Sequence, residues 1–473
     1  MEYESVIGLE IHVQLKTKSK MWCGCANEYG APPNTNVCPV CMGMPGVLPV
    51  ANEEAMRLTA LAGYLLNCEV PKFAKFDRKN YFYPDAPKNY QITQYDKPST
   101  RNGYVEFEFE GGLQRVGITR AHLEEDLGKN FHFDRESGVD FNRAGVPLLE
   151  IVTEPDIRNP DMAHAFLNAL KDIMIYGGVS DFDMEKGMAR CDVNISVRPV
   201  GQESFNARRE IKNMNSFSGV RRALNYEIPE QTRRTKAGET IQQGTVRWND
   251  DLGVTENMRS KEDAHDYRYF PEPDLMPFEP TDEWLEEVRS RVVELPLARK
   301  RRFMSDYELP EGDADVFVQN VPLGDFFEAA VEGVKNRKAV ANWVINNLRA
   351  KLVEAGLEIG DCQIQPAAVA ELVGLVDDKR ITSKNAQEAF GIMFETGRMP
   401  AAIADEKGWK PADAGEMETF CDAAIEANPG PADDFRNGKD AALNRILGHV
   451  MKLSQGSADP GQVRALLAKK LRG

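Results

Sequence analysis

The chain has 473 residues, of which 42% are hydrophobic and 28% are charged, and its formal net charge at pH 7 is −16. This composition is typical of a globular protein with two or three domains, and no apolar run approaches the roughly 18 residues of a membrane span. The acidic balance argues against a general nucleic-acid coat but permits local basic patches, and the absence of a secretory signal favours a cytoplasmic location.

The first predicted element is a β-strand at residues 6–15. Apolar residues alternate strictly with polar ones here, and a period of two is the pattern of a half-buried strand. Glu10, His12 and Gln14 therefore share the polar face. A surface strand of an antiparallel sheet has the same alternation, because its outer face meets water. The pattern alone does not separate a functional face from a solvated one.

Four cysteines follow in two close pairs, Cys23 with Cys25 and Cys38 with Cys41. Two such pairs, separated by a loop rich in glycine, proline and asparagine, suit a tetrahedral zinc site. Four thiolates leave no position open for water, so the predicted role of the zinc ion is structural. Disulfides are the alternative, but nothing in the sequence indicates an oxidising compartment.

A helix is predicted at residues 53–66, followed by an aromatic and basic stretch at residues 76–91. Pro84 and Pro87 exclude a helix interior in this stretch. Lys79 and Lys88 are interleaved with tyrosines, a combination that binds phosphates and stacks on bases. A tyrosine-rich buried loop with solvated lysines explains the same residues equally well.

Three further strand patterns carry acidic residues, at residues 118–126, 146–154 and 190–198. In the first, alternation puts Arg120, His122 and Glu124 on one face. In the second, Glu150 interrupts an apolar run, where an unpaired carboxylate is costly to bury. In the third, Asp192 and Asn194 alternate with apolar neighbours, as the polar residues do in the first strand of the chain.

If these strands form one sheet, then Glu10, His12, Glu124, Glu150 and Asp192 gather on one face. Crowded carboxylates need protons or cations, and Mg²⁺ prefers oxygen ligands and usually bridges to substrate phosphates. The pattern therefore predicts a magnesium site for phosphoryl transfer or nucleotide chemistry. The alternative is that the strands never converge.

Basic residues follow, and Lys212, Arg259 and Arg268 are of the kind that neutralise a polyphosphate. The sequence contains neither a P-loop nor a dinucleotide-binding glycine motif, so a nucleotide site must be built another way. After Pro277 the pattern changes to helices, with Thr281 as the predicted cap of a helix that begins at Asp282. Further helices are predicted from Ser383 and, as an amphipathic pair, at residues 437–472.

Several of these stretches together closely resemble the B subunit of the aspartyl/glutamyl-tRNA(Asn/Gln) amidotransferase. The stretches are Gly8–Leu15, Cys38–Cys41 with Pro45 and Gly46, Phe76–Gln91, His122–Asp126, Asn142–Gly145, Lys212–Phe217 and Asp266–Asp274. The resemblance spans essentially the whole chain and rests on many motifs in the same order.

The resemblance implies an α+β fold, with a mostly antiparallel, cradle-like catalytic domain followed by an all-helical region with a tRNA-binding tail. The implied domains are residues 1–290 with the Cys₄ zinc motif, a helical connector at 291–325 and a helical domain with the tail at 326–473. In the tail, Lys452, Lys469, Lys470 and Arg472 are expected to contact tRNA phosphates.

The resemblance also implies the reaction. ATP phosphorylates the side-chain carboxylate of misacylated Glu-tRNA(Gln) or Asp-tRNA(Asn), and ammonia then displaces the phosphate. The ammonia comes from glutamine hydrolysed by a partner amidase, the A subunit, and the small C subunit makes the complex a heterotrimer. The implied cofactors are ATP, Mg²⁺ and a structural Zn²⁺.

Residue by residue, the resemblance assigns Glu10, His12, Glu124 and Glu150 as ligands of magnesium and substrate. Glu125 adjoins Glu124 as a further candidate, although strand parity favours Glu124, and Asp192 and Asn194 complete the site. The implied contacts to phosphates or to the acceptor end of tRNA are Lys79, Lys88, Lys212, Arg259 and Arg268. The chain departs from the family pattern at Lys186, Met188 and Asn206. If these residues contact the nucleotide, nucleotide binding would differ from that of the family.

Two other classes of protein fit parts of the pattern. A standalone ATP-dependent amide ligase would use the same acidic sheet face, and a non-catalytic tRNA-binding scaffold would use the zinc motif. Ammonia-dependent activity without partner subunits favours the first, and loss of activity in Glu10→Ala or Glu150→Ala with tRNA binding retained counts against the second. No residue reports which misacylated tRNA is used.

Overall fold

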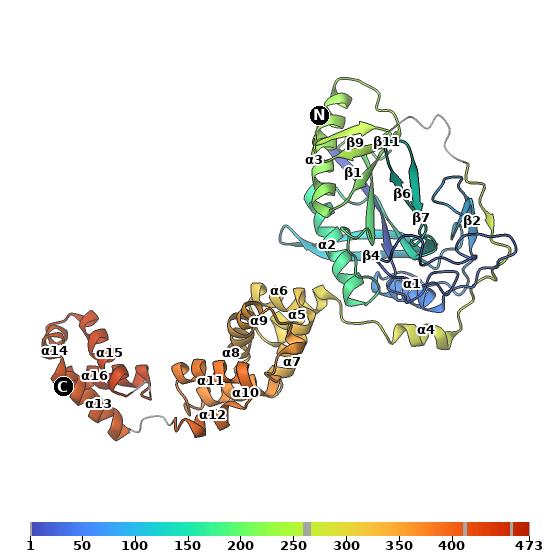
Figure 1. The fold of residues 1–473 in the computed structure, drawn as a ribbon. Coiled ribbons are helices and arrows are strands. Elements are labelled where there is room, and N and C mark those ends of the chain that lie inside the picture. Colours follow the sequence, from blue (N-terminus) through green and yellow to red (C-terminus); the bar gives the residue numbers. More distant parts are fainter. Residues whose placement is uncertain (1, 259–265, 410–413, 455–456, 473) are drawn as a thin grey trace. The chain divides into compact units, whose positions relative to one another are not determined.

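The computed structural model describes residues 2–258, 266–409, 414–454 and 457–472. The chain forms two compact units, residues 1–297 and 298–473, which Figure 1 shows as ribbons. Within the described residues, all strands lie in the first unit and the second unit is helical. The predicted α+β class is confirmed, while the predicted boundaries near residues 290 and 325 stay predictions.

The main sheet has eight strands, all of which belong to the first unit. Their bounds are β1 Tyr3–Gln14, β4 Thr100–Phe109, β5 Gly112–Glu125, β8 Pro147–Thr153, β9 Ala189–Pro199, β10 Arg209–Met214, β11 Gly244–Asn249 and β12 Val254–Asn257. The strand order is β12-β11-β10-β9-β1-β8-β5-β4, and neighbours run antiparallel except the parallel pair β10 and β11. The four strands that carry the predicted polar face are therefore direct neighbours, in the order β9-β1-β8-β5.

Two smaller sheets accompany the main one. One contains β2 (Asp77–Asn80), β3 (Tyr90–Thr93) and β13 (Phe270–Pro271), and the other is the hairpin of β6 (Lys129–His132) and β7 (Ser137–Asp140). Strand β3 contacts β5, so the aromatic and basic stretch of the sequence lies against the main sheet.

One face of the main sheet packs on three helices, α1 (Glu53–Leu65), α2 (Pro160–Tyr176) and α3 (Phe217–Lys236). The apolar side chains of β1 that alternate with Glu10 and His12 are fully buried in this core. Helix α1 matches the predicted helix, and Asn52 caps it by accepting a hydrogen bond from the backbone N–H of Ala55. Because the apolar face is covered by helices, the polar side chains of the same strands are directed to the opposite face.

Helix α4 (Asp282–Arg289) begins as predicted, since Thr281 accepts a hydrogen bond from the backbone N–H of Trp284. The second unit has one core around Phe303, Phe317 and Phe327 and another in the helices that follow residue 413. No helix in the described part of the chain is long and apolar enough to cross a bilayer.

The helices from residue 296 onward are α5 Pro296–Asp306, α6 Glu311–Gln319, α7 Val321–Val331, α8 Arg337–Asn342, α9 Arg349–Ala355, α10 Pro366–Asp377, α11 Ser383–Thr396, α12 Pro400–Glu406, α13 Ala414–Ala427, α14 Pro429–Arg436, α15 Leu443–Leu453 and α16 Pro460–Arg472, with a π-helix at Trp343–Leu348 and 3₁₀ turns at Ile359–Asp361 and Asp440–Ala442.

Candidate active site

The strand register places four polar residues in one row across the centre of the main sheet. Arg190 of β9 stands opposite His12 of β1. His12 in turn stands opposite Glu150 of β8, and Glu150 stands opposite His122 of β5. Directly opposed residues of antiparallel strands project from the same face, so these side chains become neighbours although they are far apart in the sequence.

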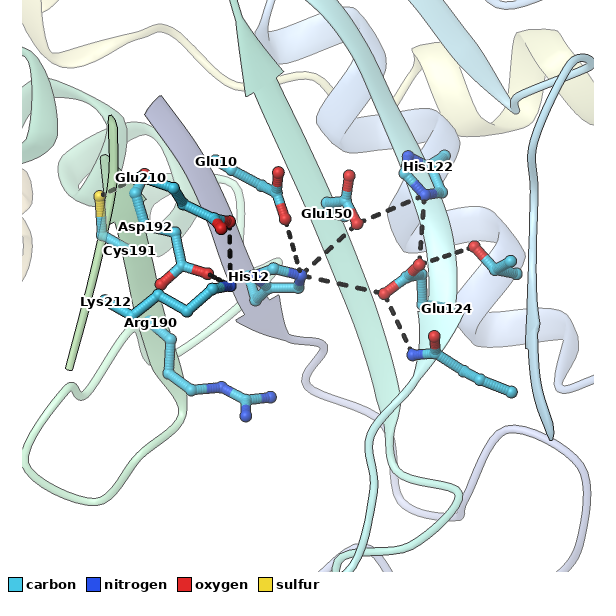
Figure 2. A network of polar contacts seen from close by, with 12 residues as sticks. Glu10, His12, His122, Glu124, Glu150, Arg190, Cys191, Asp192, Glu210 and Lys212 are labelled. Carbon is cyan, nitrogen blue, oxygen red and sulfur yellow. Dashed lines mark hydrogen bonds and ion pairs between the residues drawn. The ribbon is translucent and has the colours of Figure 1, made fainter. Parts of the chain in front are cut away.

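Glu10 and Glu124 flank this row, each two positions from a histidine on the same strand. The Nε2 atom of His12 lies 3.7 Å from Oε1 of Glu10, 3.5 Å from Oε2 of Glu150 and 4.0 Å from Oε2 of Glu124. The Nε2 atom of His122 lies 3.4 Å from Oε1 of Glu124 and 3.7 Å from Oε2 of Glu150. These five residues, which point toward one another in Figure 2, are called the carboxylate–imidazole cluster below.

Most of the cluster is withdrawn from solvent. His122 and Glu124 are each 2% exposed and Glu150 is 6% exposed. Strand β3 of the small sheet fixes Glu124, because Thr93 Oγ1 donates a hydrogen bond of 2.7 Å and Gln91 Nε2 donates one of 3.2 Å to its carboxylate. The aromatic and basic stretch thus supports one side of the cluster.

Burial and close charges shift the pKa values of the cluster in different directions. Burial raises the pKa of Glu10, and the neighbouring Glu150 raises it further. Burial also acts to raise the pKa of Glu124, but the hydrogen bond and charge of His122 outweigh it and lower that pKa. Burial acts to lower the pKa of His12, and contact with Glu150 outweighs it, so the pKa is raised. The shifts therefore favour the ionised form of Glu124 and the protonated form of His12, while they disfavour the ionised form of Glu10.

The donor atoms of the cluster fit a divalent cation. They form two groups, Glu10–His12–Glu150 and His122–Glu124–Glu150, and within each group the ligand atoms lie within 4.8 Å of one another. The nitrogen–oxygen distances of 3.4–4.0 Å exceed the length of about 2.8 Å of a charge-assisted hydrogen bond. Carboxylate oxygens are the donors that Mg²⁺ and Mn²⁺ prefer, and imidazole is also accepted by transition metals.

Asp192 lies beside the cluster, opposite Glu10 on the neighbouring strand. Its Oδ2 accepts a hydrogen bond of 2.7 Å from Lys212 Nζ, which lies 3.0 Å from Glu210 as well. Burial acts to lower the pKa of Lys212, but the charge of Asp192 outweighs it and the pKa is raised. Asn194, also predicted here, stands opposite Gly8, two positions further along the strand.

A second cluster gathers the four cysteines of the predicted zinc motif. The sulfur atoms of Cys23, Cys25, Cys38 and Cys41 lie within 4.8 Å of one another, and all four are free thiols. A hydrogen bond from Cys23 lowers the pKa of Cys41 to about 4, against the effect of burial. The ammonium of Lys20, which is fully buried, lies 3.7 Å from the Cys41 sulfur. Four convergent sulfurs beside a buried cation fit a thiolate-bound metal.

Comparison with known proteins decides the family. The model of the GatB/GatE catalytic domain matches residues 5–286, and that of the GatB domain matches residues 325–471. The chain belongs to the GatB family. It is 50% identical to the aspartyl/glutamyl-tRNA(Asn/Gln) amidotransferase B subunit of Carboxydothermus hydrogenoformans over 99% of both chains. It is 48% identical to the protein of that name from Caldanaerobacter subterraneus and 47% identical to that from Persephonella marina, each over the full length of both chains.

Two lysines of this GatB-family chain differ in their surroundings. The Nζ atom of Lys79 lies 5.0 Å from the ring centroid of Tyr267. The charges of Glu124 and Glu150 raise the pKa of Lys79 against the effect of burial. Lys88 instead forms an ion pair with Glu125, whose carboxylate also accepts a hydrogen bond of 2.9 Å from the backbone N–H of Ile92.

Glu125, predicted as a further magnesium ligand, therefore belongs to neither metal-binding group of the cluster. Successive residues of a strand project to opposite faces, and Glu125 has the parity of the core-facing Leu123. Arg268, predicted to contact phosphate, is exposed and lies 3.9 Å from Asp266. Arg259 lies outside the described residues, so its predicted role stays a prediction.

A cavity of 480 Å³ adjoins the end of β1 in the first unit. Gln14, which has the same strand parity as Glu10 and His12, lines it, as do Lys186 and Met188, two of the positions that depart from the GatB pattern. Gln14 donates a hydrogen bond of 3.0 Å to Asp126, which also accepts one of 2.7 Å from Arg190. The third departure, Asn206, donates a hydrogen bond of 2.7 Å to the carbonyl of Val197 and does not line the cavity.

Three residues of the site are absent from the predicted ligand set. The strand pattern places His122 on the correct face but not among the ligands, although His122-Leu123-Glu124 mirrors Glu10-Ile11-His12 with the same spacing. Thr93 and Gln91 belong to a separate small sheet, and nothing in the local sequence indicates that they contact Glu124.

Proposed function

We propose that this chain is the amidating subunit of a tRNA-dependent amidotransferase. It phosphorylates the side-chain carboxylate of Glu-tRNA(Gln), Asp-tRNA(Asn) or both with ATP, and ammonia then displaces the phosphate to give Gln-tRNA(Gln) or Asn-tRNA(Asn). The single observation that carries the proposal is the mostly buried carboxylate–imidazole cluster in a chain that belongs to the GatB family.

In this proposal Glu10, His12, Glu124 and Glu150 hold magnesium with the nucleotide. Bound magnesium neutralises the charge that develops on the transferred phosphoryl group. A carboxylate oxygen of the substrate accepts the γ-phosphoryl group, and ADP leaves. When ammonia then attacks the acyl phosphate, phosphate is a good leaving group, whereas hydroxide or oxide would be a poor one. Thr93 and Gln91 hold the carboxylate of Glu124 in one orientation, so this charged group is already in place before the reaction.

Two lysines near the cluster bind the phosphates of the nucleotide in this proposal. Lys79 is partly buried near the carboxylates and Lys212 is held by Asp192. Both lysines therefore supply positive charge to a polyphosphate from restrained positions. Asp192 positions Lys212, and Asn194 completes this edge. We propose that the nucleotide extends from the cluster toward the cavity at the end of β1, whose size suits a small ligand.

Ammonia, in this proposal, comes from glutamine hydrolysed by a partner amidase, and a small third subunit makes the complex a heterotrimer in the cytoplasm. Zinc in the Cys₄ cluster has a structural role. The helices after residue 413 act as the tRNA-binding tail. There Lys470 forms an ion pair of 2.7 Å with Asp422, and Arg472 forms one with Asp440, which leaves Lys452 and Lys469 as the stronger phosphate contacts.

Reconstitution tests the proposal directly. The chain is combined with the amidase and small subunits, and ATP-dependent conversion of Glu-tRNA(Gln) and Asp-tRNA(Asn) is measured. Conversion of at least one is expected, and conversion of neither would overturn the proposed function. Full activity of the isolated chain with free ammonia would instead favour a standalone ligase, and tRNA binding without conversion would favour a scaffold.

A further inference from the structure

Arg120 of β5 borders the carboxylate–imidazole cluster and forms no hydrogen bond within the described residues. Its ion-pair partner is Glu150, whose Oε1 atom lies 3.7 Å from Arg120 Nη2, beyond the length of about 2.8 Å of a charge-assisted hydrogen bond. The Nε atom of Arg120 is shielded from solvent and has no hydrogen-bond partner in the part of the chain that the structure describes. The guanidinium therefore holds unused donors beside the cluster.

Other arginines of the main sheet are held by acidic partners. Arg115, Arg190 and Arg198 each donate a hydrogen bond of 2.7–2.8 Å to a carboxylate. Glu150 is not such a partner for Arg120, because its other oxygen, Oε2, faces the two imidazoles, as Figure 2 shows. The side chain of Arg120 is also 37% exposed. A guanidinium with free donors, accessible and next to the cluster, is suited to an anionic ligand from outside the chain.

A β-bulge directs Arg120 to the face of the cluster. Ile118 of β5 packs in the core, and so do Ala121 and Leu123. Regular alternation from Ile118 would turn residue 120 into the core as well. The register of β5 on β8 shifts between Ile118 and Arg120, so the parity is reversed and Arg120 lies on the same face as His122. Bulges redirect side chains in this way and are common next to active sites.

The strand register also places Arg120 on the side of the cluster that is remote from the cavity at the end of β1. Arg120 stands opposite Val152 of β8. Gln14, which lines the cavity, stands opposite Leu148, and Glu150 lies between these two positions of β8. In the proposed function the nucleotide extends toward that cavity, and phosphoryl transfer needs the attacking and leaving oxygens roughly in line. The attacking carboxylate therefore approaches from the side of Arg120.

We propose that Arg120 binds the side-chain carboxylate of the glutamyl or aspartyl group that the chain phosphorylates. This inference rests on the proposed function. A guanidinium donates two parallel hydrogen bonds to a carboxylate, and each carboxylate oxygen keeps a further lone pair. One of these oxygens forms the bond to the γ-phosphorus of ATP. The bond between that phosphorus and the bridging oxygen breaks, and ADP leaves with the electron pair.

Steady-state kinetics of the reconstituted complex tests the role of Arg120. Arg120→Met should raise the KM for the misacylated tRNA about tenfold or more and leave the KM for ATP nearly unchanged. Arg120→Lys keeps the charge but not the paired donors, so it should recover part of the loss. Arg115→Met is the matched control, because Arg115 lies on the same strand and is held by Glu106. It should leave both KM values unchanged.

Equilibrium binding without ATP gives a second measurement that does not depend on catalysis. The unaltered complex should bind the misacylated tRNA that it converts more tightly than the amidated product, which carries an amide in place of the carboxylate. Arg120→Met should lose this preference while it binds the amidated product as the unaltered complex does. Circular dichroism of the variant should match that of the unaltered chain, and Arg120→Lys provides the same comparison if Arg120→Met does not fold.

Unchanged KM values in Arg120→Met, or a preference for the misacylated tRNA that persists in this variant, would overturn the role of Arg120. A rise in the KM for ATP that equals or exceeds the rise for tRNA would assign Arg120 to a phosphate and overturn it as well. These outcomes leave amidation by the unaltered complex, and hence the proposed function, intact. Conversion of neither misacylated tRNA by the unaltered complex would overturn both.

Discussion

The Oε2 atom of Glu150 lies 3.5 Å from the Nε2 atom of His12, although the two residues are far apart in the sequence. Antiparallel pairing of β1 with β8 sets this distance, because the two residues stand directly opposite each other. The pair is the centre of the carboxylate–imidazole cluster.

Glu150→Gln should lower ATP-dependent amidation by about 100-fold or more, because it removes the carboxylate charge that faces both histidines and that a bound cation would share. The measurement is single-turnover conversion of misacylated tRNA by the reconstituted complex. Glu154→Gln is the matched control, since Glu154 follows the end of the same strand and its carboxylate accepts a solvent-exposed hydrogen bond from Thr119. Equal losses in both variants would contradict the assignment.

Thr93→Val should weaken divalent-cation binding about tenfold, because it removes the hydroxyl that orients Glu124 from outside the cluster. Titration with Mn²⁺ measures the effect. Thr119→Val removes an equivalent hydroxyl–carboxylate hydrogen bond at an exposed position and should leave binding unchanged. Unchanged affinity in Thr93→Val would show that β3 does not position the ligand.

Cation affinity should fall as the pH is lowered. The pKa of His12 is raised above its ordinary value of 6.5, so in the metal-free protein the imidazole keeps its proton to a higher pH than a free histidine does, and this proton must leave before a cation binds. Below this raised pKa the affinity should fall by about tenfold per pH unit, and above it the dependence on His12 should vanish. Mn²⁺ titrations between about pH 6 and about pH 8 measure the slope. His132→Asn should keep the slope of the unaltered chain, and the same slope in His12→Asn would contradict the assignment.

Cys38→Ser should abolish stoichiometric zinc binding and lower the thermal unfolding temperature, since a structural zinc site requires all four ligands. Zinc content by atomic emission and the unfolding temperature by calorimetry are the measurements. Cys362→Ser, a partly exposed cysteine of the helical unit, should keep the zinc. Retained zinc in Cys38→Ser would mean that the sulfur cluster is not its site.

Lys186→Glu should raise the KM for ATP roughly two- to fivefold with kcat nearly unchanged, because an added negative charge at the rim of the cavity repels a polyphosphate. Steady-state kinetics at varied ATP concentration measures the KM and kcat. The increase in KM should be smaller at high salt. Lys97→Glu makes the same charge change away from the cavity lining. A fall in kcat without a change in KM would place Lys186 outside the nucleotide path.

Several elements followed from the sequence alone because their cause is local. Strict alternation over residues 6–15 predicted β1 and the face that carries Glu10 and His12. Thr281 and Asn52 satisfy the first N–H groups of their helices with their own side chains, so a helix start depends on a few consecutive residues. The two cysteine pairs are likewise joined by a short loop. Closure of this loop brings the pairs together, so the cysteine cluster could be predicted from local sequence.

The sequence by itself determined which residues face away from the core, since a period of two is a property of one strand. Only the tertiary structure decided which strands are neighbours and in what register, and hence that His122 meets Glu150, that Thr93 holds Glu124, and that Glu125 turns to Lys88. Pairing between strands depends on backbone hydrogen bonds that any residue except proline can make. The sequence of a strand therefore says little about which strand lies next to it.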